Sequence, residues 1–364
     1  MSRTDVRIPS LDGLRAISIA LVLVAHLAGT RHFPLSATAE HFWALGEFGV
    51  RVFFVISGFL ITGLLMQELA RDGRVHLGRF YLRRTLRIFP PYYTLLLALG
   101  LASMAGALTL APRDLVHGAT YTSNYYLDRS WFLGHTWSLS VEEQFYLLWP
   151  AVLLLAGLRR GLFIAAAVVA LSPVIRVVEW ELVRSAGAGV GLRFETIADS
   201  IATGCLLAGA RGWLHGNAIY RRLLDGAWFA VVPVVGALGH LTQDHPLVSF
   251  GLGMTVANLA IALCVDWAVT HHEGRVGRVL NAPPLVFVGL ISYSLYLWQQ
   301  PFLNRASPAP LAAFPLNIAA AVTLALLSYY IVERPALRLR KQLERALFRP
   351  KATLPGGLPS PSSS

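Results

Sequence analysis

Charged residues are scarce in this chain. Only 14% of its 364 residues are Asp, Glu, Lys or Arg, whereas 55% are hydrophobic. Soluble globular chains carry about 25% charged residues, and a single soluble core cannot bury such an apolar surplus. The composition excludes a soluble enzyme and a secreted disulfide-rich domain. It leaves a polytopic helical membrane protein, because a β-barrel would show alternating strands of about ten residues instead of long apolar runs.

Lysine and cysteine are rarer still. Lys341 and Lys351 are the only lysines, and arginine supplies the rest of a net charge of +11. The arginines lie mainly between apolar runs, where membrane topology and anionic lipid headgroups explain them, so no nucleic-acid partner is expected. Cys205 and Cys264 both lie inside apolar runs without metal-ligand spacing. They predict neither a disulfide nor a metal site.

Long apolar segments predict an all-α fold with about ten transmembrane helices, since a hydrocarbon core of about 30 Å needs about 20 apolar residues. We divide the chain into a transmembrane domain over residues 1–340 and a cytoplasmic, partly disordered tail over residues 341–364. The segments are Leu14–Gly29, Val50–Leu69, Tyr92–Leu110, Leu139–Gly157, Leu162–Trp180, Thr196–Ala210, Ala227–Leu241, Phe250–Val269, Leu285–Leu303 and Ala312–Val332.

Most basic residues lie in every second loop between the apolar segments. With a cytoplasmic N-terminus, these loops are the cytoplasmic ones. This asymmetry predicts that both termini lie in the cytoplasm. Asp12 and Arg15 intrude into the first apolar stretch and no small-residue cleavage site follows. We therefore expect a retained first helix instead of a signal peptide.

The first candidate site residues are Arg15 and His26. On one helix they lie only about 20° apart in angle and about 16 Å apart along the axis. A neutral imidazole inside the bilayer can act as a base or a nucleophile. The alternative is a helix-packing hydrogen bond plus an arginine that sets topology, although intramembrane ionisable groups are usually functional.

The second candidate group lies in HTWSLSVEEQFYLLWP, residues 135–150. We expect Glu142 to open a helix at a depth similar to His26, where it would orient the imidazole or polarise an acceptor hydroxyl. The alternative is that acidic residues here only favour a helix N-terminus. The other predicted substrate-binding residues of this stretch are Trp137, Glu143, Gln144 and Tyr146.

The third candidate group lies in FYLRRTLRIFPPYY, residues 80–93. Arg84 and Arg87 share a helix face, with Arg83 beside them, and we expect Pro90–Pro91 to interrupt the backbone. Paired guanidiniums suit phosphate oxygens; the alternative is that they only set topology. The sequence contains no phosphate loop, metal-ligand cluster or G-x-S-x-G elbow, so no metal is expected.

Six motifs follow one another between Leu11 and Pro335. They are LDGLRAISIALVLVAH, GEFGVRVFFVISGFLIT, FYLRRTLRIFPPYY, TWSLSVEEQFYLLWP, SYSLYLWQQP and VERP. Together they resemble the membrane-bound acyltransferase family 3, the bacterial O-acyltransferases of surface glycans and some antibiotics. The resemblance implies a location in the bacterial inner membrane and a cytoplasmic acyl-CoA donor, usually acetyl-CoA. It also implies transfer to a hydroxyl, most often of a sugar and frequently on the outer side.

The resemblance also implies roles for individual residues. Arg15 and His26 take the places of the family's essential R-x10-H pair, and Glu142 that of the acidic residue after the WSL motif. Arg84 and Arg87 occupy conserved arginine positions. We expect the donor's phosphates near the arginines of this motif, Arg83, Arg84 and Arg87, and the acyl group near His26, which would act as base or transient acyl carrier.

The chain departs from the family pattern in two places. Members often have Asp where this chain has Arg51, and His where it has Gln299. Gln299 cannot exchange protons near neutral pH, whereas we expect His26 to be unaffected. There is also no C-terminal SGNH-type hydrolase module, which favours a smaller or lipid-linked acceptor.

The prediction is therefore an integral membrane O-acyltransferase that moves an acyl group from acyl-CoA to a hydroxyl of a carbohydrate or glycosylated acceptor. A transporter or flippase of a glycolipid or small organic acid is the alternative, since intramembrane charges fit that class too. Against it, the sequence shows no internal repeat.

Overall fold

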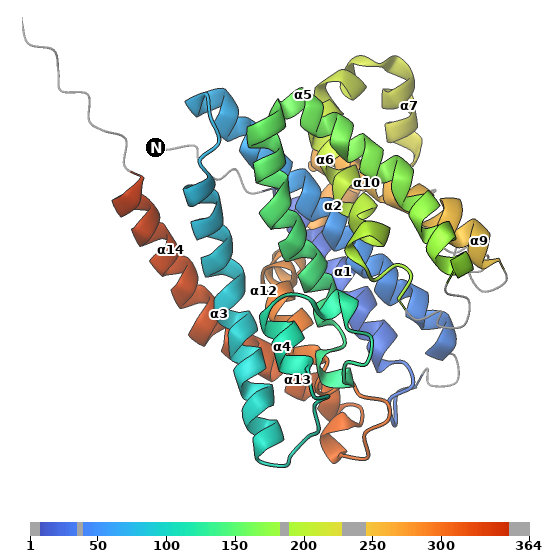
Figure 1. Ribbon diagram of the computed structural model, residues 1–364, viewed down its shortest axis with the longest axis vertical. Helices are drawn as coiled ribbons and strands as arrows, with labels where there is room; N and C mark the ends of the chain where they lie inside the picture. Colours follow the sequence, from blue (N-terminus) through green and yellow to red (C-terminus); the bar gives the residue numbers. More distant parts are fainter. Residues whose placement is uncertain (1–7, 35–38, 183–188, 228–244, 349–364) are drawn as a thin grey trace, which may run out of the picture.

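The computed structural model describes residues 8–34, 39–182, 189–227 and 245–348, and in these ranges every regular element is helical. The predicted all-α class is confirmed (Figure 1). The elements are α1 (Pro9–Leu27), α2 (Ala39–Asp72), α3 (Leu77–Met104), α4 (Asp114–Ala119), η2 (Ser123–Tyr125), η3 (Trp131–Leu133), α5 (Thr136–Leu182), α6 (Phe194–Gly216), α7 (Ala218–Ala227), α9 (Pro246–Val248), η5 (Ser249–Gly253), α10 (Met254–Thr270), α11 (Arg275–Leu280), α12 (Pro283–Gln299), η6 (Pro310–Ala312), α13 (Leu316–Ser328), η7 (Tyr329–Glu333) and α14 (Arg334–Leu347).

Six helical stretches among the described residues are long and apolar enough to cross a membrane, so the expected ten are not confirmed. The stretches are Ser10–Leu27, Ala44–Asp72, Leu77–Met104, Trp131–Leu182, Pro246–Thr270 and Leu316–Leu347. Helix α12 has only 17 residues, and α6 is not among the six. The predicted segment Ala227–Leu241 lies almost wholly outside the described residues. The predicted domain boundary after residue 340 falls inside α14.

Helix α5 accounts for two of the predicted segments. Its 47 residues would measure about 70 Å if straight, more than twice the thickness of a hydrocarbon core. At Gly157 the backbone has φ 77° and ψ 168°, a conformation that favours glycine. Figure 1 shows the two limbs meeting at this bend. The bend separates the predicted segments Leu139–Gly157 and Leu162–Trp180.

Helix α3 runs without a break through Pro90 and Pro91, so the expected interruption is wrong. Proline removes a backbone donor and leaves carbonyls of the preceding turn without a helical partner. The carbonyls concerned are those of Leu86 and Arg87, four residues before the prolines. Close to them, Tyr293 of α12 donates to the carbonyl of Ile88 at 2.9 Å, and Thr94 donates to that of Pro90 at 2.7 Å. The first of these bonds ties the stretch to α12, and proline is tolerated in membrane helices where a neighbouring helix supports the backbone.

The bundle is centred on α2, which packs against α1 and α6, while α1 also packs against α12 and α6 against α5. At the left of Figure 1, α3 and α14 lie side by side. Glycines permit a close crossing of α2 and α6: a Cβ atom at Gly58 would lie 2.0 Å from the carbonyl oxygen of Ile201, and one at Gly204 would lie 2.1 Å from that of Val55. This reciprocal backbone contact is typical of small-residue helix interfaces in membranes.

Gly58→Ala is therefore expected to lower the free energy of unfolding by about 1–3 kcal/mol, the usual cost of overpacking. The measurement is thermal unfolding of the detergent-purified protein. Gly63→Ala is the matched control, because a Cβ atom there meets nothing within 4 Å. Equal melting temperatures for the Gly58 and Gly63 variants would show that the α2–α6 crossing is not tight.

A second buried feature of the bundle is a polar cluster between α2, α5, α6 and α10. Arg176 and Asp199 are both 0% exposed and form an ion pair at 2.9 Å. Arg51 donates to Ser200 at 3.2 Å and to Asn258 at 3.3 Å. Arg51, which stands where the family pattern often has Asp, therefore lies inside this cluster. Its hydrogen bonds compensate part of the free-energy cost of burying the guanidinium.

Candidate functional site

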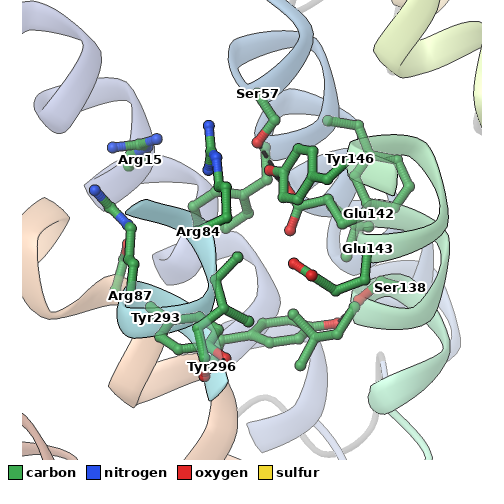
Figure 2. Close-up of a pocket in the computed structure, with 16 residues that line it drawn as sticks. Arg15, Ser57, Arg84, Arg87, Ser138, Glu142, Glu143, Tyr146, Tyr293 and Tyr296 are labelled. Carbon is green, nitrogen blue, oxygen red and sulfur yellow. Dashed lines mark hydrogen bonds between the residues drawn. The ribbon is translucent and has the colours of Figure 1, made fainter. Parts of the chain in front are cut away.

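A cavity of about 90 Å³ lies between α1, α2, α3, α5 and α12. That volume accommodates several water-sized groups. Figure 2 shows basic side chains on one side of the cavity and acidic side chains on the other. Of the predicted site residues, the structure gathers six in its lining: Arg15, Arg84, Arg87, Glu142, Glu143 and Tyr146.

The basic side of the cavity combines two helices. Arg15 comes from α1 and lies 3.6 Å from Asp12, one turn earlier. Arg84 and Arg87 come from α3, three residues apart, so both reach the same face. The guanidinium of Arg84 lies over the ring of Tyr146, 4.4 Å from its centroid, which fixes it by a cation–π contact. This side is suited to an anionic ligand.

The acidic side belongs to α5. Oε1 of Glu142 accepts hydrogen bonds from Ser57 of α2 and from Tyr146, the latter at 2.7 Å. Oε1 of Glu143 is buried and has no hydrogen-bond partner among the described residues. A helix dipole favours acidic residues in the first turn of a helix. Because α5 begins at Thr136, Glu142 lies beyond that turn. The expectation that Glu142 opens the helix is therefore wrong, and the dipole alternative loses support.

Hydroxyl groups of residues that were not predicted as site residues also line the cavity. Ser57 bonds Glu142, and the oxygens of Ser138 and Tyr296 lie 2.6 Å apart. Tyr293 lines the cavity too. These residues belong to the motifs GEFGVRVFFVISGFLIT, TWSLSVEEQFYLLWP and SYSLYLWQQP. The sequence therefore indicated the motifs but not which face of each helix lines the cavity.

His26 lies outside the cavity lining. Its Nδ1 is hydrogen-bonded to Oε1 of Gln299 at 2.7 Å, and its ring meets the edge of Trp131 with centroids 5.6 Å apart. The departure at Gln299 therefore lies in direct contact with His26, and the expectation that it leaves the role of His26 unaffected stays a prediction. Gln299 lies one turn of α12 beyond Tyr296, which lines the cavity. Glu142, which we expected at the depth of His26, lines the cavity together with Arg15, whereas His26 does not.

Three other predicted residues lie beside the cavity instead of lining it. Trp137 packs edge-on against Phe54, with centroids 6.2 Å apart. Gln144 bonds Asn124 and the carbonyl of Tyr121, and so ties α5 to the segment that follows α4. Arg83 forms an ion pair with Glu344 of α14. Their predicted roles in substrate and cofactor binding stay predictions.

Within the described ranges, one group of side chains has the proximity that a metal site needs, namely Glu68, Asp72 and His76. Arg79 is ion-paired with Glu68 at 3.2 Å and with Asp72 at 3.3 Å. Arg71 is also paired with Asp72, at 2.7 Å, so two guanidiniums balance the two carboxylates and the group is an ion-pair cluster at the turn between α2 and α3.

Comparison with known proteins gives a match over nearly the whole chain. The model of the family described as "Acyltransferase domain" matches residues 8–333. "Peptidoglycan O-acetyltransferase OatA" of Listeria monocytogenes is 26% identical over 367 residues, which cover 90% of this chain and 55% of that protein. "Putative peptidoglycan O-acetyltransferase YrhL" of Bacillus subtilis is 27% identical over 370 residues, which cover 90% of this chain and 54% of that protein.

The chain thus spans about half the length of these curated relatives. No solved structure matches it. The family match extends from the start of α1 to the end of η7 and includes every side chain of the cavity. The chain belongs to the acyltransferase family defined by this domain.

Proposed function

We propose that the protein is an integral membrane O-acyltransferase that moves an acetyl group from acetyl-CoA to a hydroxyl of a carbohydrate acceptor. The observation that carries the proposal is the cavity in which three arginines face two glutamates. The arginines suit the phosphates of an acyl-CoA, and the carboxylates suit a hydroxyl that must lose a proton. The names of the relatives, which specify O-acetylation of peptidoglycan, support a sugar acceptor.

The positions of the side chains support the following roles within this proposal. Arg84 and Arg87 hold the phosphates of the donor, while Arg83 stays paired with Glu344. The acyl end extends past Tyr296 toward His26, about 16 Å along α1 from Arg15. His26 takes the proton of the acceptor hydroxyl or carries the acyl group, and the bond to coenzyme A breaks as the new ester or acyl-imidazole bond forms.

The proposed location is the bacterial inner membrane, with both termini in the cytoplasm. The concentration of arginine in alternate loops supports this orientation. Reporter fusions after Arg160, at the bend of α5, should read cytoplasmic, and fusions at Asp128 should read external. A cytoplasmic reading at Asp128 would reverse the direction in which the donor enters.

Arg84→Lys tests the donor site. Lysine keeps the charge but loses the planar fork that bonds two phosphate oxygens, so the KM for acetyl-CoA should rise several-fold while the protein still folds. The assay follows release of free coenzyme A in membranes supplied with a carbohydrate acceptor. Arg160→Lys, at an exposed position away from the cavity, is the matched control.

Two outcomes would contradict the proposal. An unchanged KM in the Arg84 variant would show that this arginine only sets topology. No acetyl-CoA-dependent release of coenzyme A with any acceptor would favour a transporter, which leaves the thioester intact.

A further inference from the structure

His26 is held by a neighbour that does not titrate. Gln299 of α12 is 0% exposed, and its Oε1 lies 2.7 Å from Nδ1 of His26 on α1. The next residue, Gln300, is 3% exposed and is bonded in turn to Gln299 and to Trp131. The described contacts thus form one row of hydrogen bonds running from a backbone carbonyl to the imidazole.

The direction of this row is determined at its far end. The carbonyl oxygen of Trp131 can only accept, so the group of Gln300 that contacts it at 2.9 Å must be the donor Nε2. Oε1 of Gln300 then faces Gln299 and accepts from its Nε2 at 3.1 Å. The remaining atom of the Gln299 amide, Oε1, therefore faces His26 and can only accept.

The consequence is a defined tautomer. Because Oε1 of Gln299 accepts, Nδ1 of His26 must carry the hydrogen. A neutral imidazole has one N–H, so the lone pair that takes a proton or attacks a thioester belongs to Nε2. We propose that Gln299 is a positioning residue that holds His26 as the Nδ1–H tautomer and so leaves the lone pair on Nε2, an inference that rests on the proposed function.

The surroundings keep the row rigid. Nε1 of Trp131 donates back to the carbonyl of Gln300 at 2.8 Å, so tryptophan and glutamine are joined by two hydrogen bonds. The ring of Trp131 also packs edge-on against His26. A Cβ atom at Gly134 would lie 3.0 Å from Nε2 of Gln300, so a glycine leaves the room that this amide occupies. Partners that orient a functional histidine usually act in this way.

The tautomer can be measured without substrate. In protein labelled with ¹⁵N-histidine, the nitrogen chemical shifts separate an N–H from a bare ring nitrogen, and the signals lost in His26→Gln identify His26 among the eleven histidines. Wild type should show Nδ1–H. Gln299→Met, which matches the length of glutamine but offers no oxygen, should lose that preference. Gln299→Glu loses the donor to Gln300 but keeps an oxygen acceptor toward Nδ1, so it should retain the preference.

The kinetic arm separates positioning from folding. Gln299→Met should lower kcat about 10- to 100-fold, the usual cost of losing an orienting partner, with the KM for acetyl-CoA unchanged because Arg84 and Arg87 remain. Gln299→Glu should recover most of kcat. Bare Nδ1 in wild type, or a Gln299→Met protein that keeps both tautomer and kcat, would overturn the inference. An inactive wild type that shows Nδ1–H would instead contradict the proposed function and leave the tautomer assignment standing.

Discussion

His26→Gln is expected to abolish detectable acetyl transfer. Removing a general base costs about 10²–10⁴ in rate, and losing a covalent nucleophile costs more. Glutamine at position 26 can still donate a hydrogen bond to Oε1 of Gln299, the partner of the imidazole in the structure. The packing of α1 against α12 should survive, and only the titrating nitrogen is lost.

Three measurements on purified protein check this result: the rate of transfer, the melting temperature and the affinity for acetyl-CoA. Only the first should change, because the arginines that bind the donor are untouched. His272→Gln, at an exposed position in the turn between α10 and α11, is the control. Transfer within a few-fold of wild type in His26→Gln would reduce His26 to a structural residue.

Much of the membrane architecture could be predicted from the sequence, because hydropathy reports directly on lipid exposure. The predicted segments overlap α1, α2 and both limbs of α5. The continuity of α3 through Pro90–Pro91 could not be judged in the same way, since support from another helix, such as the bond from Tyr293 to Ile88, comes from 205 positions away. The predicted segments Thr196–Ala210 and Leu285–Leu303 overlap α6 and α12 as well, but hydropathy does not tell which helices they pack against.

The candidate site could likewise be predicted only where it depends on spacing within one helix. Arg84 and Arg87 could be assigned to one helix face from their spacing, and both line the cavity. The partner of His26 could not be found in this way, because Gln299 lies 273 positions after His26 in the sequence. In the sequence alone, Gln299 is only a residue that cannot titrate in place of the family's histidine. Only the contact between α1 and α12 shows that this amide acts on the imidazole. Ser57 was missed similarly, because its bond to Glu142 spans two helices.

Glu142→Gln is expected to lower kcat by about 10²–10⁴, the usual contribution of a group that moves a proton. Both hydrogen bonds that hold the carboxylate, from Ser57 and Tyr146, end on Oε1. The amide oxygen of glutamine can accept the same two bonds, so the side chain should keep its place. The substitution replaces Oε2, an acceptor, by an NH₂ group, a donor, and removes the negative charge that faces the arginines.

The Glu142→Gln measurement needs kcat and KM separately, together with the melting temperature. The KM for acetyl-CoA should stay the same or fall, since the arginines lose a competing carboxylate, whereas kcat should drop. Glu273→Gln is the control, because that carboxylate is 91% exposed in the turn between α10 and α11. A Glu142→Gln protein that melts like wild type and keeps its kcat within a few-fold would show that the carboxylate only anchors Tyr146 and Ser57 and has no part in the proton transfer.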